Sequence, residues 1–208
     1  MKTNNYDFIA PWYDRLSRMV FFSAQTNAQK EQLSFIENHQ RILIVGGGTG
    51  WILEEINNIC EDLRITYVEI SASMIQLAKQ KKCDKNCVDF VNLPIENFTD
   101  DLPYDVILTA FLFDNFEKEQ AELVFFNLHQ KLKKDGIWLF SDFVDHHKKN
   151  HWKNLFLKLM YLFFDKVARI EAKELVNMHP YFKDNGYKTV QEKGYYKTFI
   201  KAMVFRKE

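Results

Sequence analysis

The sequence predicts an α/β fold: a doubly wound sheet that is mainly parallel, carries helices on both faces and ends in an antiparallel C-terminal strand. Three observations lead to this fold class. Short apolar strands alternate with amphipathic helices between residues 41 and 145, which is the pattern of a parallel sheet. A glycine-rich turn follows the first strand. The last two segments of the chain resemble strands joined by a short link. So short a link favours antiparallel pairing.

Length and composition favour one folded domain. The 208 residues are 47% apolar and 15% aromatic, so a substantial core with an apolar pocket or lid is expected. The net charge is zero, but residues 1–147 hold 14 basic and 22 acidic side chains, whereas residues 148–208 hold 14 and 6. The basic part either solvates the outer faces of helices and strands or faces an acidic substrate, an anionic membrane or a nucleic acid.

The cysteines and the chain start indicate a cytoplasmic protein. Cys60, Cys83 and Cys87 form no disulfide framework, and no further ligand stands near them to complete a metal site. The adjacent imidazoles of His146 and His147 do not make a metal site by themselves, so no bound metal is expected. The first residues lack the apolar core of a signal peptide, and no apolar run reaches the ~18 residues that span a bilayer.

Short apolar runs and helical periodicity define the central elements. Strands are expected at 41–45, 64–68, 87–91, 104–110 and 137–140, and helices at 50–60, 71–82 and 117–133. Ser71 or Ser73 can cap the second of these helices, and Asp135-Gly136 marks the turn into the fifth strand.

The flanks of this central part have their own patterns. Residues 6–36 read as helical with an interruption near Pro11, and they include a second helix at about 24–38. Beyond residue 145, helices are expected at 152–164 and 171–182. Strands follow at 187–195 and 197–206, with Gly194 as the link between them.

The first strand runs directly into a glycine loop. Residues 42–45 are apolar and mostly β-branched, as a strand buried on both faces requires. Gly46, Gly48 and Gly50 let the backbone bend sharply and approach a ligand without Cβ atoms in the way. Thr49 is expected to cap the following helix, whose free N–H groups favour an anionic or polar ligand. The loop therefore predicts a nucleotide-like cofactor.

The spacing of the glycines excludes the dinucleotide fingerprint G-x-G-x-x-G. Counted from Gly46, the third glycine position holds Trp51, and counted from Gly47, the second holds Thr49. The pattern G-x-G-x-G fits fully. Glu69 ends the second strand 19 residues beyond the loop, where its carboxylate can accept hydrogen bonds from two ribose hydroxyls. An NAD-dependent oxidoreductase is therefore disfavoured.

These motifs together resemble a known family. ILIVGGGTG followed by ITYVEIS is similar to the first two motifs of class I S-adenosylmethionine-dependent methyltransferases, which have a Rossmann-like fold. YDVILTAFLFDNF and DGIWLFSDF stand at the family's fourth and fifth strands. YDFIAPWYDRL resembles the start of the small-molecule branch that includes the ubiquinone and menaquinone C-methyltransferases. The resemblance covers residues 6–143 best.

The resemblance implies S-adenosylmethionine as the cofactor and S-adenosylhomocysteine as the product. By position, the three loop glycines would approach the methionine portion of the cofactor, and Glu69 would hold the ribose. Phe111 would lie near the reactive sulfonium, and Tyr13 would fold over the cofactor from the N-terminal extension.

On the adenine side, the resemblance implies contacts by Ile70 and Met74, although a methionine on a helix is also an ordinary core residue. The family often has an aspartate after the third strand that accepts from the adenine amino group. Here that position falls near Pro94, so the contact would come from another group nearby: the Ile95 backbone, Asn92 or Glu96.

Transfer of an activated methyl group needs mainly alignment, and a general base only when the acceptor must lose a proton. The candidate bases are Asp114, Asp142, His146, His147 and His151. We favour Asp114 and His146. Asp114 lies among aromatic residues, where desolvation would raise its pKa, but it could instead cap the helix near Phe116. Asp142 could instead only satisfy loop amides.

The segment 152–164 is apolar nearly all round. The residues that recur at helical spacing are Trp152, Phe156, Met160 and Phe163. They would form a lid over an aromatic or lipid-like substrate. The alternatives are a peripheral membrane contact through residues 148–164, whose lysines suit an anionic surface, and plain packing or a homodimer contact.

We therefore expect a single methyltransferase domain over residues 1–208. Its parts would be an N-terminal helical extension (1–40), a cofactor-binding core (41–145), a helical lid (146–185) and a C-terminal strand pair (186–208). The expected reaction is methyl transfer to a small, apolar or aromatic molecule. The alternatives are a nucleic-acid methyltransferase, which would need a motif such as Asn-Pro-Pro-Tyr where FLFD stands, and a non-catalytic module that binds S-adenosylmethionine.

Overall fold

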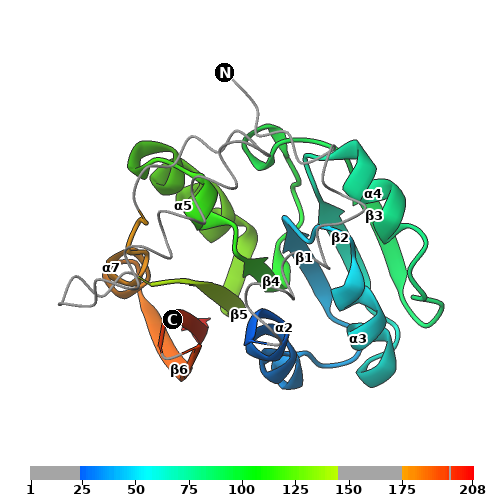
Figure 1. Ribbon diagram of the computed structural model, residues 1–208, viewed down its shortest axis with the longest axis horizontal. Helices are drawn as coiled ribbons and strands as arrows, with labels where there is room; N and C mark the ends of the chain where they lie inside the picture. The colour runs from blue at the N-terminus through cyan, green and yellow to red at the C-terminus, as the bar shows by residue number, and fades with distance from the viewer. Residues whose placement is uncertain (1–23, 145–174, 197) are drawn as a thin grey trace.

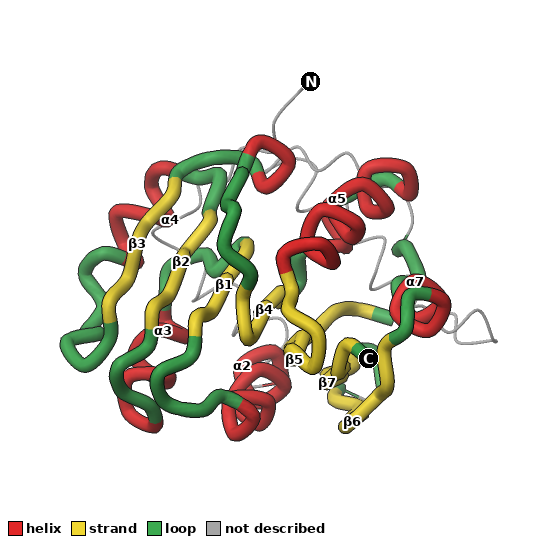
Figure 2. Tube along the Cα trace, turned by 180° about the vertical axis from the view of Figure 1, so that it is seen from behind, coloured by secondary structure: helices red, strands yellow, loops and turns green. Residues whose placement is uncertain are grey.

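The computed structural model describes residues 24–144, 175–196 and 198–208. These residues form a seven-stranded sheet in the order β3-β2-β1-β4-β5-β7-β6, which can be followed across Figure 2. The strands are β1 (Arg41–Val45), β2 (Arg64–Val68), β3 (Cys87–Val91), β4 (Tyr104–Ala110), β5 (Leu132–Phe143), β6 (Tyr187–Tyr195) and β7 (Ile200–Lys207). The first five pair in parallel, and β7 runs antiparallel between β5 and β6. The predicted fold class is confirmed.

Helices cover both faces of this sheet, as Figure 1 shows for α3 on one side of β1 and β4 and α5 on the other. The helical elements are α2 (Ala24–Lys30), η2 (Glu31–Phe35), α3 (Trp51–Ile59), α4 (Ala72–Ala78), η3 (Ile95–Asn97), η4 (Phe113–Asn115), α5 (Lys118–Lys131) and α7 (His179–Asp184). Within the described ranges, no helix has the length and apolar character needed to cross a membrane.

The strands are apolar throughout because both of their faces are buried. In β1, Leu43 and Val45 pack into the cluster that contains α5, whereas Ile42 and Ile44 pack against α3 and α4. Side chains that alternate along a strand point to opposite faces. The run RILIV, which has no polar alternation after its first residue, is therefore what a doubly covered parallel strand requires.

Aromatic rings fill the side of the sheet that α5 covers. Phe125 of α5 stacks on Trp138 of β5 with ring centroids 5.4 Å apart, and Phe182 of α7 stacks on Phe205 of β7 at 3.9 Å. The indole N–H of Trp138 donates to the Thr109 hydroxyl at 2.9 Å, so its polar atom is satisfied inside the core. Much of the aromatic content of the chain therefore serves the core.

Gln32 attaches the helix before the sheet to its centre. Its Nε2 donates to the carbonyls of Phe140 and Met203 at 2.9 and 2.8 Å, and its Oε1 accepts from the Ser141 hydroxyl at 2.8 Å. The side chain is 2% exposed. These three bonds join η2 to β5 and β7. They could not be predicted from the apolar periodicity of the sequence.

Replacing Gln32 by leucine is expected to lower the free energy of unfolding by about 2–4 kcal/mol, because buried polar partners lose their hydrogen bonds. Urea denaturation measures this loss. Gln29→Leu is the matched control, since Gln29 makes one partly buried bond, at 3.4 Å within its own helix. Equal losses in the two variants would contradict this account of Gln32.

Two predictions about where helices begin are wrong. The residue in the cap position before α3 is Gly50, at φ 80°, and not Thr49. Residues 175–178 of the expected helix 171–182 are not helical, and α7 begins at His179 with Pro180 in its first turn. Proline disfavours the helical conformation of the residue before it and suits the first turn of a helix.

The link between the last strands also differs from the prediction. Gly194 lies inside β6, opposite Lys201 of β7. The turn instead includes Tyr196 and Thr198, which have φ of 49° and 66°. Non-glycine residues rarely adopt these angles, and the glycine therefore gave a misleading signal for the turn.

Candidate functional site

The glycine loop after β1 has the shape that its sequence predicts. Gly46, Gly48 and Gly50 have φ of 68°, 62° and 80°, which is the left-handed region that favours glycine. The Gly46 amide donates to the Val68 carbonyl at 2.9 Å, so the loop begins level with the end of β2. The backbone is thus turned at the carboxyl edge of the sheet, where doubly wound folds bind ligands.

The glycines serve different purposes. A Cβ on Gly47 would lie 2.4 Å from the Tyr67 ring, and a Cβ on Gly50 would lie 2.6 Å from Ala78 of α4. Both are therefore needed for close packing of the protein against itself. A Cβ on Gly48 would meet no described atom within 4 Å. Gly48 is the loop residue with room for a ligand beside its backbone.

Two side chains from the end of β2 hold Gly48. Glu69 Oε2 accepts from the Gly48 amide at 3.0 Å and Glu69 Oε1 accepts from the Ser71 amide at 2.9 Å. The Tyr67 hydroxyl donates to the Gly48 carbonyl at 3.0 Å. Glu69 is 6% exposed, yet each carboxylate oxygen can accept more than one hydrogen bond. The carboxylate thus fixes the loop, and its predicted ribose contact stays a proposal.

The segment after β2 lies on the side expected for adenine. Asn92 Nδ2 donates to the carbonyls of Glu69 and Ile70, both at 2.9 Å, which ties this segment to the end of β3. Ser71 caps α4 by accepting from the Met74 amide at 3.2 Å, as predicted. Met74 and Ile95 are 2% and 5% exposed, so these side chains serve the core, and their predicted adenine contacts stay a proposal.

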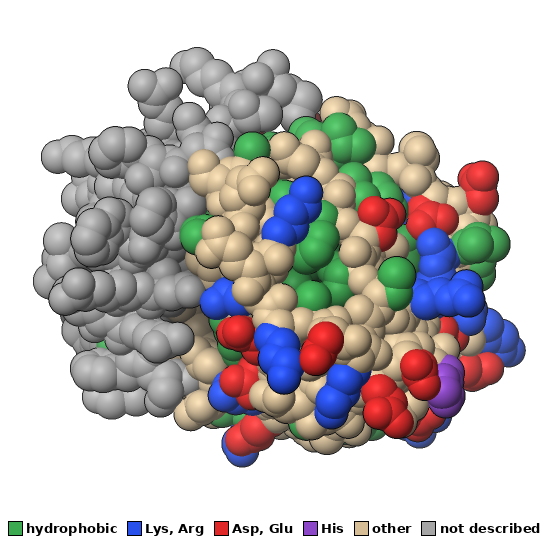
Figure 3. All heavy atoms as spheres, turned by 90° about the vertical axis from the view of Figure 1, so that its right-hand side faces the viewer, with side chains coloured by type: hydrophobic (Ala, Val, Ile, Leu, Met, Phe, Trp, Pro, Cys, Tyr) green, Lys and Arg blue, Asp and Glu red, His purple; other side chains and the backbone are tan. Residues whose placement is uncertain are grey.

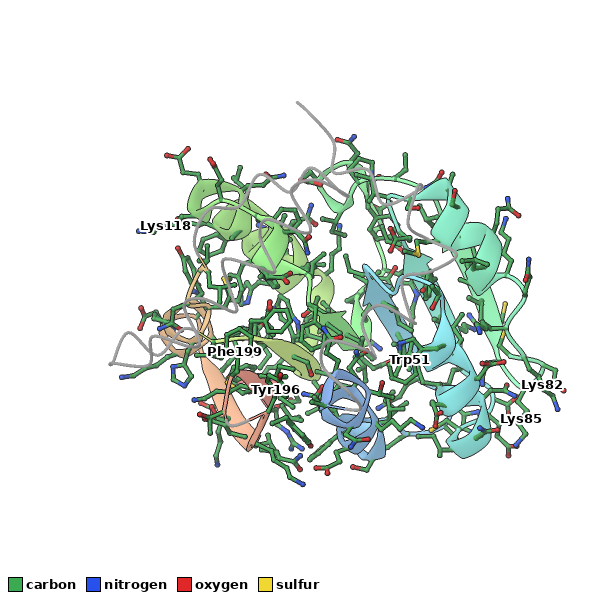
Figure 4. The ribbon with its side chains drawn as sticks, in the orientation of Figure 1. Trp51, Lys82, Lys85, Lys118, Tyr196 and Phe199 are labelled. Atoms are coloured by element: carbon green, nitrogen blue, oxygen red, sulfur yellow. The ribbon has the colours of Figure 1, made fainter. Side chains whose placement is uncertain are left out.

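The loop after β4 comes close to the glycine loop. The Leu112 side chain lies 3.1 Å from where a Cβ of Gly46 would be. Phe111 has φ 53°, an uncommon conformation for a bulky residue that costs on the order of 1–3 kcal/mol. Its ring packs 4.9 Å from Phe143, which packs 5.2 Å from Phe199. Figure 4 shows Phe199 beside β5, with Tyr196 near it.

Two carboxyl groups lie at this loop. Burial, followed by the charge of Asp142, raises the pKa of Asp114 well above its ordinary value, as predicted for a carboxylate among aromatic residues. Burial also raises the pKa of Asp142 to about 7. The hydrogen bonds that Asp142 accepts from the amides of Phe113 and Phe143 oppose this shift. Asp114 lies within η4 and is not the cap of α5, whose N-cap is Glu117. The capping alternative for Asp114 is therefore wrong.

Residues 43–138 match the family model described as a methyltransferase domain. This stretch runs from β1 into β5 and contains the glycine loop, Glu69 and the loop after β4. Residues 43–138 thus form a class I methyltransferase domain. The family recognised in the sequence is thereby confirmed, and S-adenosylmethionine is the cofactor of this class.

Two curated relatives align with the methyltransferase domain. The malonyl-(acyl-carrier protein) O-methyltransferase of Bacillus anthracis is 36% identical over 107 residues, which are 50% of this chain and 37% of that protein. The demethylmenaquinone methyltransferase of Thermotoga maritima is 30% identical over 122 residues, 57% of this chain and 52% of the relative. The chain thus spans about half or less of the length of these relatives.

Among solved structures, the DhpI–SAH complex has a TM-score of 0.71 to this chain, with 17% identity and coverage of 97% of this chain and 93% of that one. At this identity the similarity concerns the fold. The similarity in fold therefore continues beyond residue 138, where the family model ends, and includes β6 and β7.

The raised pKa of Asp142 predicts how stability depends on pH. The folded protein holds this proton more tightly than the unfolded chain, whose aspartate pKa is about 3.9. The free energy of unfolding therefore falls as the pH rises from about 4 to about 7, by up to about 1.4 kcal/mol per unit of pKa difference. Relative to wild type, Asp142→Asn should gain stability over this window in denaturation at several pH values. Parallel pH profiles would contradict the assignment.

Several predicted site residues lie outside the described part of the chain. They are Tyr13, His146 and the lid residues Trp152, Phe156, Met160 and Phe163. Among the described residues, no three His, Cys, Asp or Glu side chains gather in a way that could hold a metal ion. Sequence reasoning missed the roles of Gly47 and Tyr67, because a ring that packs over a loop leaves no signal in periodicity.

Described lysines of the basic C-terminal part have local partners. Lys193 bonds Glu31 at 2.7 Å and Lys201 bonds Glu192 at 2.5 Å. The ion pairs of Lys193 and Lys201 fit the interpretation that the lysines of this part lie at the surface. The face shown in Figure 3 lies on the side of α3 and α4, and basic and acidic side chains are intermingled there as well. Lys82 and Lys85, labelled in Figure 4, follow α4 on that side.

Proposed function

We propose that the protein transfers a methyl group from S-adenosylmethionine to a small acceptor with apolar or aromatic character. One observation carries the proposal: Glu69 accepts from the amides of Gly48 and Ser71, and a Cβ added to Gly48 would meet no described atom within 4 Å. The uncovered backbone of Gly48 lies beside the fixed carboxylate of Glu69. This arrangement suits a ligand with a polar amino-acid end and a ribose diol.

The residues would divide the work by position. Gly48 lets the methionine portion approach the loop, and the carboxylate of Glu69 accepts the ribose hydroxyls. Ile70, Met74 and the Ile95 backbone lie on the adenine side. Positioning matters most here, because the bound cofactor supplies a methyl group that is already activated.

The acceptor would lie on the other side, at the loop after β4. Phe111 presents its ring there, and the carboxyl of Asp114 is the candidate to take a proton from the acceptor. Burial and the charge of Asp142 raise the pKa of Asp114, and perturbed carboxyl groups of this kind are common at catalytic sites. Tyr13, His146 and the segment 152–163 would complete the site as cover, second base and lid.

Two relatives show how far acceptors vary in this class, since one is named for malonyl-(acyl-carrier protein) and the other for demethylmenaquinone. The row of rings Phe111, Phe143 and Phe199 favours an acceptor with an apolar or aromatic part. A nucleic-acid methyltransferase and a non-catalytic S-adenosylmethionine-binding module remain the alternatives. We place the protein in the cytoplasm because its three cysteines are free thiols. The segment 148–164 stays the candidate for a membrane or homodimer contact.

A labelled-methyl assay tests the function. Purified protein and S-adenosylmethionine with a labelled methyl group are incubated with demethylmenaquinone, malonyl-(acyl-carrier protein), small aromatic acids and amines, and a short RNA and DNA. Label that moves to a small molecule is the expected result. Label that moves only to RNA or DNA would favour the nucleic-acid alternative, and cofactor binding without transfer would favour the binding module.

A further inference from the structure

The loop after β4, residues 111–115, is held in a strained shape. Phe111 has φ 53°, and its amide donates to the Ser141 carbonyl of β5 at 2.8 Å. Asn115 Nδ2 donates to the carbonyls of Phe111 and Leu112 at 3.0 and 3.2 Å and to Asp114 Oδ1 at 2.7 Å. A conformation that is unfavourable for a bulky residue persists only when its surroundings fix it.

Asp142 supplies a further attachment for this loop, from the end of β5. Its Oδ2 accepts from the Phe113 amide at 3.2 Å and its Oδ1 accepts from the Phe143 amide at 2.8 Å. One carboxylate thus joins the loop after β4 to the strand that lies next to it. In an asparagine, an NH2 donor would replace one of the two acceptor oxygens and would face one of the two amides. The side chain is 4% exposed, so water does not readily replace a lost bond.

We infer that Asp142 is a positioning residue for the proposed methyl transfer: it fixes the loop 111–115 so that Phe111 and Asp114 keep one orientation toward the acceptor. The inference rests on the proposed function, because that function makes this loop the acceptor side. The charge of Asp142 also contributes to the raised pKa of Asp114, so the two carboxyl groups interact. Asp142 thus acts through its neighbours and does not touch the reacting atoms.

Hydrogen exchange of the backbone amides tests this role directly. In Asp142→Asn, the amides of residues 111–115 are expected to exchange about tenfold or more faster than in wild type. Asp105→Asn is the matched control. Asp105 lies at the other end of β4, where its Oδ2 accepts a hydrogen bond from the Arg41 amide at 2.8 Å. That control should leave exchange at 111–115 unchanged. Wild-type exchange rates at 111–115 in Asp142→Asn would overturn the inference.

A second measurement needs no variant, in case Asp142→Asn does not fold. In wild type, the amide proton signals of Phe113 and Phe143 should shift together in NMR as one carboxyl group titrates. Independent behaviour of the two signals would overturn the inference.

Two further readouts separate a positioning role from a merely structural one. Asp142→Asn should bind S-adenosylhomocysteine within about threefold of wild type, because the glycine loop and Glu69 are unchanged. On any acceptor that is methylated, kcat should fall about tenfold to hundredfold with the KM for S-adenosylmethionine nearly unchanged, as expected for misplaced groups. An unchanged kcat would overturn the inference. Wild-type protein that binds no S-adenosylhomocysteine would instead refute the proposed function, while the exchange data still decide whether Asp142 fixes the loop.

Discussion

Replacing Gly47 by alanine is expected to abolish most of the cofactor binding. The new Cβ would lie 2.4 Å from the Tyr67 ring, so either the loop or the ring must move. The same ring carries the hydroxyl that donates to the Gly48 carbonyl, and its displacement would move the residue proposed to face the ligand. We expect S-adenosylhomocysteine affinity to fall roughly tenfold to hundredfold, and overpacking to cost about 1–3 kcal/mol of stability. Calorimetry and urea denaturation measure the two effects.

A double-mutant cycle with Tyr67→Leu provides the control. If the clash with the ring is the cause, Gly47→Ala should cost much less in the Tyr67→Leu background than in wild type. Gly47 is not among the glycines with positive φ, so alanine brings no backbone strain of that kind at this position. Equal losses in the two backgrounds would show that the ring is not what excludes a side chain from Gly47.

Replacing Glu69 by glutamine is expected to weaken S-adenosylhomocysteine binding by about tenfold to hundredfold. Hydrogen bonds to a charged group are worth about 1.5–3 kcal/mol each, and glutamine offers one acceptor oxygen where Glu69 uses both for backbone amides. The variant therefore loses a ribose acceptor and also leaves the Gly48 or the Ser71 amide without its carboxylate partner. Calorimetric titration measures the change in affinity.

Glu55→Gln is the matched control for Glu69→Gln. Glu55 lies on α3 and pairs at 2.6 Å with Lys30 on the surface, where an ion pair contributes little. The control should bind like wild type. If Glu69→Gln also binds like wild type while remaining folded, Glu69 has no ribose role.

The strands and the glycine loop could be predicted because local sequence determines them. Residues 41–45 and 104–110 read as apolar runs, and both are strands with the predicted bounds. Positive φ at Gly46, Gly48 and Gly50 follows from glycine itself. Glu69 follows from counting to the end of the next strand. In each case the deciding signal is carried by a short stretch of the sequence.

The remaining features depend on contacts between distant segments. Gln32 reaches Phe140 and Met203, more than a hundred residues away, and Tyr67 reaches back over Gly47 from the neighbouring strand. The sequence makes Asp142 a candidate base, with a bond to loop amides as the alternative, and in the structure it accepts from the Phe113 amide of a different loop. Periodicity shows which face a side chain occupies, but it does not show which partner lies there.

The central claim is that the loop around Gly48, together with Glu69, binds S-adenosylmethionine. Calorimetric titration of the wild-type protein with S-adenosylhomocysteine, and with NAD for comparison, tests it most directly. We expect one S-adenosylhomocysteine bound per chain, with a dissociation constant on the order of micromolar, and no comparable binding of NAD. Absence of S-adenosylhomocysteine binding, or tighter binding of NAD, would contradict it.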